Sequence, residues 1–215
     1  MAGVAVLASG GLDSAVLTAE LAATEAVVPI YVRCGLVWEA EEERALDAFL
    51  AALASPRVAA PVRLELPVAG LYGAHWSTGG EDVPGAETPD SAVYLPGRNI
   101  LLIGLAAVWC SLNDVGKIAI GSLEDNPFPD GTPAFFADYS RLLSAALSHE
   151  IEVVAPLRGL HKWQIIARNA GLPLELTLTC IAPVGGRHCG DCNKCFERRE
   201  AFRKANVADR TSYAR

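Results

Sequence analysis

The junction at residues 4–14 constrains the fold of this chain more than any other stretch. An apolar run, Val4-Ala5-Val6-Leu7-Ala8, leads into Ser9-Gly10-Gly11 and then into Leu12-Asp13-Ser14. This order predicts a buried strand, a tight turn and the first turn of a helix. Ligands of α/β proteins bind outside the carboxyl ends of such strands, so we expect a binding site at this junction.

The predicted turn has the features of a phosphate site. Gly10 and Gly11 let the backbone approach an anion closely, and the free N–H groups and positive dipole end of the following helix point at it. Ser9 and Ser14 can donate hydrogen bonds to phosphate oxygens. Asp13 can cap the helix or hold a magnesium ion that bridges those oxygens. A plain helix N-cap with a glycine turn is the alternative.

Two common nucleotide-binding patterns do not fit this turn. The glycines are not followed by Gly-Lys-Ser/Thr, and the first thirty residues contain no Lys, so the loop is not of the Walker type. The G-x-G-x-x-G spacing of a dinucleotide fold is also missing from the turn.

Strand-like and helix-like segments alternate along the chain, which predicts an α/β fold with a doubly wound parallel sheet and helices on both faces. The five predicted strands are short and rich in Val and Ile: Val4–Ala8, Val27–Val32, Val62–Leu66, Lys117–Ile120 and Ile151–Ala155. The segments with helical spacing are Leu12–Ala23, Glu39–Leu53, Asn99–Leu112 and Phe135–Leu147. Two long connections, Pro67–Leu95 and Gly121–Pro133, are predicted to be lids or substrate walls.

Length and charge limit the classes of protein that fit. With 215 residues and 51% hydrophobic residues, the chain is long enough for one well-filled domain with a small appendage. We expect an α/β domain over residues 1–175 and a cysteine-rich segment with a C-terminal helix over residues 176–215. The net charge of −7 argues against an extended nucleic-acid surface. The basic residues around the cysteines are interpreted as a solvated helix face, with a local basic patch as the alternative: Arg187, His188, Lys194, Arg198, Arg199, Arg203 and Lys204.

The compartment is expected to be the cytoplasm. Met1-Ala2-Gly3 has no basic region and runs straight into the first apolar run, unlike a signal peptide. No uncharged apolar stretch is long enough to span a bilayer. In a reducing compartment, six cysteines are not expected to form a disulfide framework.

Four of the cysteines have the spacing of a metal site. They form a C-x8-C-x2-C-x2-C array, and two-residue gaps let thiolates converge on one ion: Cys180, Cys189, Cys192 and Cys195. Four thiolates close the coordination shell, which predicts a structural zinc site. Reduced cysteines in a surface turn and an iron–sulfur cluster are the alternatives. Cys110 is predicted to be a buried core residue, and Cys34 to pack in the interior or face the cleft.

Four segments in order along the chain resemble one enzyme family. Ser9–Ser14 resembles the S-G-G-x-D-S signature of the pyrophosphate-loop ATP hydrolases. Together with Tyr94–Leu102, Pro156–Ile165 and Thr177–Cys195, it resembles the 7-cyano-7-deazaguanine synthase family over essentially the whole chain. The resemblance implies an adenine nucleotide alpha hydrolase-like fold with a small C-terminal zinc-binding helical segment.

The resemblance also implies an activity. The family's enzymes are ATP-dependent ligases of queuosine biosynthesis, which convert 7-carboxy-7-deazaguanine and ammonia to the 7-cyano compound through adenylated intermediates. The expected ligands are ATP with Mg²⁺, a structural Zn²⁺, ammonia and a small deazapurine carboxylate. Neither a membrane nor a nucleic acid is an expected partner, and a homodimer is left open.

Site residues follow from the same resemblance. The residues expected to bind ATP are Ala8, Ser9, Gly10, Gly11, Leu12, Asp13, Ser14 and Gly121. The expected catalytic residues are Asp13, Arg98 and Lys162, with Lys162 placed on the pyrophosphate or the developing charge. From the residues alone, Asn99 can instead be the cap of a helix, and Lys162 can be a solvated lysine.

The chain departs from the family pattern in two segments expected to line the base or adenine pocket. Leu36 stands where the family has a polar Gln, and Ser122–Asp130 matches only loosely. One alternative is therefore a divergent adenylating enzyme that acts on another carboxylate or deazapurine. A tRNA thiolase would need a basic RNA-binding face and a reactive cysteine in the cleft, for which only Cys34 is placed. A non-catalytic nucleotide-binding module is a third alternative.

Overall fold

The computed structural model describes residues 3–215 and contains one five-stranded sheet in which every strand pair is parallel. Met1 and Ala2, on which part of the signal-peptide expectation rests, lie outside the described residues. The strands are β1 (Val4–Leu7), β2 (Val27–Arg33), β3 (Val62–Glu65), β4 (Lys117–Ala119) and β5 (Glu152–Val154). Their order across the sheet is β3-β2-β1-β4-β5.

This strand order confirms the predicted doubly wound fold. The chain adds β2 and β3 on one side of β1 and then returns to add β4 and β5 on the other. The order therefore reverses at β1, and the carboxyl end of β1 is the topological switch point where such folds bind ligands.

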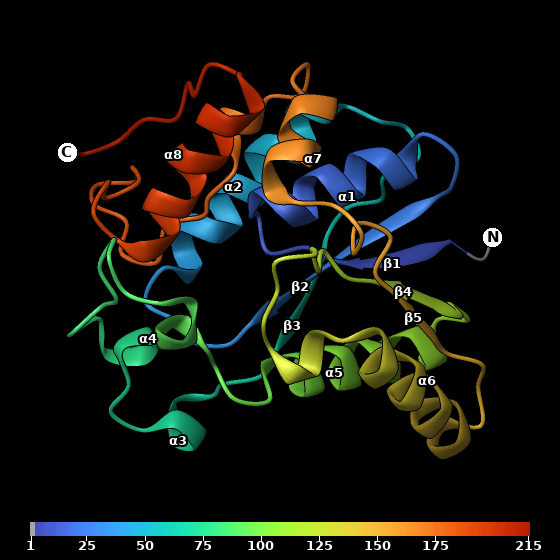
Figure 1. Cartoon of the computed structure of the whole chain (residues 1–215). Coiled ribbons are helices and arrows are strands. Elements are labelled where there is room, and N and C mark those ends of the chain that lie inside the picture. The colour runs from blue at the N-terminus through green and yellow to red at the C-terminus, as the bar shows by residue number, and fades with distance from the viewer. Residues whose placement is uncertain (1–2) are drawn as a thin grey trace.

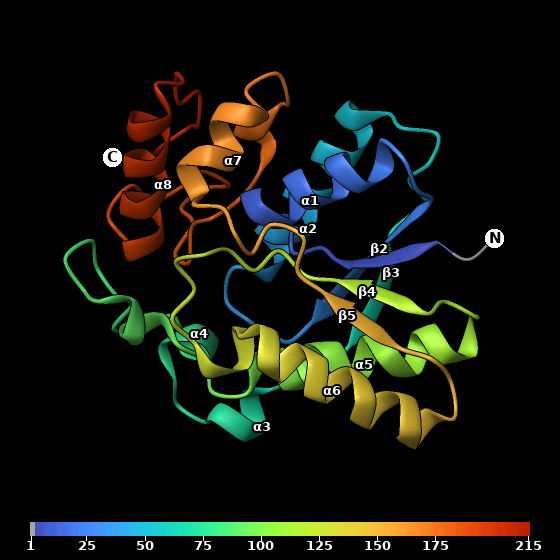
Figure 2. The same ribbon diagram turned by 45° about the vertical axis from the view of Figure 1, so that its right-hand side comes forward.

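Helices cover both faces of the sheet (Figure 1 and Figure 2). One face carries α5 (Arg98–Leu112) and α6 (Pro133–Leu147). The other side carries α1 (Leu12–Ala22), α2 (Glu39–Leu53), α7 (Lys162–Arg168) and α8 (Asn193–Ala205). Two one-turn helices, α3 (Ala69–Tyr72) and α4 (Trp76–Gly79), lie in the connection after β3. Short 3-10 turns occupy Asp90–Val93, Pro129–Gly131 and Leu174–Leu176.

Side chains of β1 alternate between two core clusters. Val4 and Val6 pack with residues of α1, α7 and α8, whereas Ala5 and Leu7 pack with residues of α5 and α6. A strand buried on both faces requires apolar residues throughout, which explains its uninterrupted apolar run. Cys110 of α5 is fully buried in the second cluster, as predicted.

The predicted strands and long helices agree with the structure to within two residues at each end. Both long connections contribute residues to the cleft described below, and their role as lids or substrate walls stays a prediction. The first of them also docks on the cysteine-rich segment: the Asn193 N–H donates to the Pro84 carbonyl at 3.0 Å, and the Asn193 side-chain amide donates to the Thr88 carbonyl at 2.8 Å.

The cysteine-rich segment packs on the α/β core through α8. Ala201 and Phe202 belong to the same buried cluster as Val4 and Val6. The division of the chain at residue 175 stays a prediction. Within residues 3–215, no helix combines the length and the apolar character needed to cross a bilayer.

Candidate active site

Hydrogen bonds within the turn at residues 9–14 fix its conformation between β1 and α1. Gly11 is the N-cap of α1, and its carbonyl accepts hydrogen bonds from the Ala15 N–H at 3.0 Å and from Ser14 Oγ at 3.1 Å. The Ser9 N–H donates to Ser14 Oγ at 3.2 Å. Of the two alternatives given for Asp13, the capping role is wrong, because the N-cap of α1 is Gly11. The Asp13 carboxylate is therefore available to the cleft.

Two glycines allow the turn to pack closely against its neighbours. Gly10 has a φ of +73°, and a Cβ at this position would lie 2.3 Å from the Glu42 carbonyl oxygen of α2. Gly121 follows β4, and a Cβ there would lie 3.1 Å from the Ser14 backbone nitrogen. Position 10 therefore accepts only glycine without a shift of α2, and Gly121 brings the end of β4 up to the start of α1.

Gly10→Ala is expected to lower the free energy of unfolding by about 2–4 kcal/mol, because left-handed strain adds to a clash with backbone. Gly35→Ala is the matched control, since Gly35 has a φ of +76° but a Cβ added there would meet no atom within 4 Å. The control should lose only the strain, about 1–2 kcal/mol. Urea denaturation of both variants measures the difference, and equal losses would contradict the close approach of α2.

A cleft of about 320 Å³ opens beside this turn, at the carboxyl ends of β1, β2 and β4. This volume is at the lower end of the range for small-molecule sites, about 300–1,000 Å³. Most of the residues expected to bind ATP line the cleft: Ala8, Ser9, Gly11, Leu12, Asp13, Ser14 and Gly121. Gly10 is not among the lining residues, and its carbonyl accepts a hydrogen bond from the Leu178 N–H at 2.9 Å.

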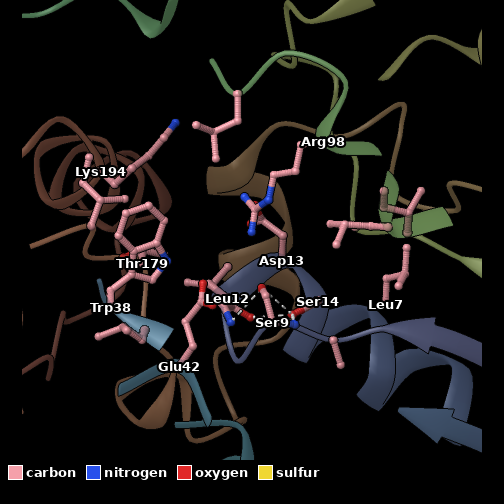
Figure 3. Close-up of a pocket in the computed structure, with 18 of the residues that line it drawn as sticks. Leu7, Ser9, Leu12, Asp13, Ser14, Trp38, Glu42, Arg98, Thr179 and Lys194 are labelled. Carbon is pink, nitrogen blue, oxygen red and sulfur yellow. Dashed lines mark hydrogen bonds between the residues drawn. The ribbon is translucent and has the colours of Figure 1, made fainter. Parts of the chain in front are cut away.

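The three expected catalytic residues also meet in this cleft. Asp13, Arg98 and Lys162 line it together, although they come from α1, α5 and α7. Figure 3 shows the Arg98 side chain pointing toward the turn that carries Asp13, and Lys194 across the cleft from Leu7. The structure therefore brings together residues that are far apart in the sequence.

Lys162 is buried among carboxylates rather than solvated. Its Nζ lies 3.3 Å from Asp13 Oδ2 and contacts Glu197 Oε1, and its side chain is 13% exposed. Burial opposes the charge on Lys162, but the two carboxylates outweigh it and raise the pKa of the amine. Burial raises the pKa of Asp13, and Lys162 opposes that shift. Lys162 therefore remains an ammonium in the cleft at neutral pH.

Arg98 and Asn99 have different roles at the start of α5. The N-cap is Gly97, so the alternative that made Asn99 the cap is wrong. Asn99 instead binds Asp130: its backbone N–H donates to Asp130 Oδ2 at 3.0 Å and its side-chain amide to the Asp130 carbonyl at 2.8 Å. Arg98 lines the cleft, and its buried Nε has no hydrogen-bond partner among the described residues.

The sequence interpretation missed one buried acid in the cleft. Glu42 lies in the acidic run at the start of α2, yet it is 9% exposed and lines the cleft. Tyr31 Oη donates to Glu42 Oε2 at 2.9 Å, and burial raises the pKa of this carboxyl to about 7 against the opposing charge of Arg98. The helical spacing of α2 could have predicted this burial, because Glu42 shares the buried face with Leu46 and Phe49.

The interpretation of the basic residues near the cysteines as a solvated helix face is wrong for three of them. His188 is buried, and its Nε2 accepts a hydrogen bond from the Thr179 N–H at 3.1 Å. Lys194 lines the cleft. Arg198 is fully buried and donates to Thr177 Oγ1 at 3.0 Å and to the Leu174 carbonyl at 2.7 Å. Arg198 therefore connects α8 to the segment that precedes the first clustered cysteine.

The four clustered cysteines converge on one point. All four are buried, and their sulfur atoms lie within 4.8 Å of one another. Cys189 Sγ lies 3.8 Å from Cys195 Sγ, and Cys192 Sγ lies 3.9 Å from Cys180 Sγ. A tetrahedral ion with metal–sulfur bonds of about 2.3 Å separates its sulfurs by about 3.8 Å. The spacing fits a single tetrahedral ion.

Backbone groups around the cysteines also suit thiolate ligands. The Cys189 N–H donates to Cys180 Sγ at 3.2 Å, and the Cys192 N–H donates to Cys189 Sγ at 3.3 Å. Such donors stabilise negative charge on sulfur and orient metal ligands. The donor set of four sulfurs closes the coordination shell, so this arrangement fits a structural ion rather than a catalytic one.

Cys34 and Leu36 lie beside the cleft. Both line a small side cavity that Arg98 and Tyr72 also border. Burial raises the pKa of the Cys34 thiol to about 11, which is the opposite of what a nucleophilic thiolate needs. Leu36 therefore lies beside the cleft and does not line it. Trp38 and Ser122, from the two divergent segments, do line the cleft.

Comparison with solved structures finds a similar fold. A predicted subunit of tRNA methyltransferase from Methanocaldococcus jannaschii matches with a TM-score of 0.50 and 16% sequence identity, covering 80% of this chain and 75% of that chain. At this identity, the likeness concerns the fold alone.

Sequence comparisons identify the family. A 7-cyano-7-deazaguanine synthase from Methanothermobacter thermautotrophicus is 32% identical over 95% of this chain and 96% of its own length. A protein of the same name from Methanothrix thermoacetophila is 33% identical over 96% of each chain. The family profile described as "Queuosine biosynthesis protein QueC" matches residues 3–206. The chain therefore belongs to the QueC family of queuosine biosynthesis proteins, together with these 7-cyano-7-deazaguanine synthases.

Proposed function

We propose that this protein is an ATP-dependent carbon–nitrogen ligase that makes 7-cyano-7-deazaguanine from 7-carboxy-7-deazaguanine and ammonia. One observation carries the proposal: Asp13 Oδ1 and Arg98 Nε are buried polar atoms of cleft-lining residues, and neither has a partner among the described residues. Buried polar atoms are normally hydrogen-bonded. The Arg98 Nε–H needs an acceptor such as a phosphate or carboxylate oxygen, and the Asp13 oxygen needs a donor or a metal cation, so ATP with Mg²⁺ and a carboxylate substrate would satisfy both. Family membership supports the reaction class.

The chemistry requires the same oxygen-activating step twice. A carboxylate oxygen is a poor leaving group, so it first attacks the α-phosphorus of ATP, forming an acyl adenylate and releasing pyrophosphate. Ammonia then displaces AMP and gives an amide. The amide oxygen is adenylated in turn, and loss of AMP and a proton leaves the nitrile. No side chain needs to become covalently attached in this sequence.

The polar residues around the turn at residues 9–14 would have distinct roles in that reaction. The N–H groups at the start of α1 and the hydroxyls of Ser9 and Ser14 would bind phosphate oxygens. Lys162 would stabilise the charge that develops on the departing pyrophosphate, and Arg98 would bind the carboxylate or a phosphate. Asp13 would hold the magnesium ion, which neutralises phosphate charge when it is bound with ATP.

We further propose that Cys180, Cys189, Cys192 and Cys195 bind a structural zinc ion. The sulfur spacing, the burial and the N–H donors support this choice. When bound, zinc would cross-link the cysteine-rich segment, residues 176–215, behind the cleft. Sulfurs that all lie within 4.8 Å of one another surround one ion more readily than a multi-iron cluster.

Isotope labelling tests the two adenylation steps. If both carboxylate oxygens of 7-carboxy-7-deazaguanine carry oxygen-18, each nitrile formed is expected to yield two AMP molecules with one labelled oxygen each. The reason is that every oxygen lost from the carboxyl carbon leaves on the α-phosphorus. Mass spectrometry of AMP, phosphate and the nitrile measures this distribution.

The same experiment separates the alternatives. Label in inorganic phosphate would indicate direct phosphorylation and contradict adenylation. Label in AMP from a different carboxylate, with no consumption of 7-carboxy-7-deazaguanine, would keep the adenylating site but refute the substrate. No AMP from any carboxylate offered would contradict the ligase itself.

A further inference from the structure

One carboxylate of α8 binds two lysines of the cleft. Glu197 Oε1 contacts Lys162 Nζ, and Glu197 Oε2 lies 2.6 Å from Lys194 Nζ. Lys162 is also paired with Asp13 at 3.3 Å, and Lys194 lies 3.9 Å from Asp90 Oδ1. Glu197 is therefore the centre of a charge network that reaches the turn at residues 9–14.

The partners of Glu197 come from different parts of the fold. Lys162 is the first residue of α7, whereas Lys194 and Glu197 lie one turn apart on α8, whose N-cap is Cys192. Both lysines line the cleft, and Glu197 is not among the lining residues. Glu197 thus pairs with both lysines without lining the cleft itself.

Burial makes this network stronger than a surface ion pair. The Glu197 side chain is 32% exposed and that of Lys194 26% exposed. Charges that are partly removed from water attract each other more strongly than exposed ones, and they are screened less by salt. Lysine side chains are long and flexible, so a fixed carboxylate also limits the positions that their amines can take.

We propose that Glu197 is a positioning residue that holds Lys162 and Lys194 at the phosphate end of the cleft, so that the cysteine-rich segment forms part of the phosphate-binding site. This inference rests on the proposed function, because it takes a polyphosphate as the ligand of the two lysines. When a phosphate reaches the cleft, Lys162 can exchange Asp13 for a phosphate oxygen while Glu197 still holds it.

The charge balance predicts a result that distinguishes a positioning role of Glu197 from a purely structural one. Asp13 and Glu197 together offset the charges of Lys162 and Lys194. Removal of the Glu197 charge leaves the cleft more positive, which favours anion binding, but it also frees the lysines from their fixed positions. Ground-state binding should therefore be kept or strengthened while turnover falls, whereas a purely structural role would weaken both.

Glu197→Gln is the direct test, with inorganic pyrophosphate as the binding probe. Calorimetry is expected to show an unchanged or up to tenfold lower Kd for pyrophosphate. Steady-state kinetics should show kcat at least tenfold lower with a KM for ATP that is unchanged or lower. Glu200→Gln is the matched control, because Glu200 lies on the same helix and pairs only at the surface, with Arg203 at 2.6 Å. The control should match the parent in both measurements.

The opposite results would overturn the proposal. A kcat within twofold of the parent, or a joint loss of pyrophosphate affinity and turnover in protein of parental melting temperature and metal content, would exclude a positioning role. If Glu197→Gln does not fold, Lys194→Gln takes its place, and pyrophosphate should bind at least threefold more weakly. Unchanged binding in that variant contradicts the proposal. Failure of the parent to use 7-carboxy-7-deazaguanine refutes the proposed substrate alone, because pyrophosphate binding is measured without it.

Discussion

Cys192→Ser is expected to abolish metal binding and to remove most of the soluble, folded protein. A structural zinc site contributes on the order of 10 kcal/mol to folding. Whole domains are stable by only about 5–15 kcal/mol, so loss of such a site is comparable to the total stability. The loss also reaches the core, because α8 begins at the residue after Cys192 and buries Ala201 and Phe202 against the sheet.

Soluble yield, melting temperature and elemental analysis measure this effect. The parent should carry about one zinc per chain. Cys34→Ala is the control, since Cys34 is a buried cysteine outside the cluster, and this variant should keep its metal. A stable, metal-free Cys192→Ser protein would contradict the structural role, and iron with visible absorption in the parent would contradict zinc.

Asp13→Asn is expected to reduce AMP formation by about 10²–10³-fold, the size typical of losing one preorganised charged or hydrogen-bonding group. Asparagine has nearly the same shape as aspartate, but it lacks the negative charge. That charge pairs with Lys162 in the structure and is proposed to hold magnesium. Because burial raises the pKa of Asp13, keeping this carboxylate charged lowers the free energy of unfolding. The neutral variant should therefore be at least as stable as the parent.

Single-turnover AMP formation and thermal denaturation, measured on the same preparation, separate these effects. Asp138→Asn provides the control, because Asp138 is exposed on α6 and pairs with Arg141 within its own helix. It should leave AMP formation unchanged. Parental AMP formation in Asp13→Asn would reject the proposed site, and a large fall in its melting temperature would show that the charge serves the fold instead.

Local patterns predicted the framework of this fold well. The strands are short apolar runs, and the helix of residues 39–53 has its polar and apolar residues at helical spacing, so each element is specified by nearby residues. The cysteine cluster was also predictable, because its gaps are themselves a local pattern. The turn at residues 9–14 was predictable both from the apolar run before it and from its own residue pattern.

Contacts between distant segments were not predictable in the same way. The alternative that made Asn99 the cap of α5 was wrong, and its actual partner, Asp130, lies in a connection with little regular pattern. In the sequence, Glu197 is one more charge on a polar helix. Only the fold shows that Lys162 lies beside it. Likewise α3 and α4 are single turns, too short for a helical spacing of apolar residues to predict.

The hydrogen bond from the Leu178 N–H to the Gly10 carbonyl has a consequence for how the site is made during translation. The glycine turn leaves the ribosome early, but the segment that closes over it, and the helix that carries Lys194, are synthesised much later. A nascent chain can form β1 and α1 and still have no closed cleft. If the cleft binds nucleotide as proposed, nucleotide should stabilise the protein only after α8 has emerged, so folding before that point depends on the elements already synthesised.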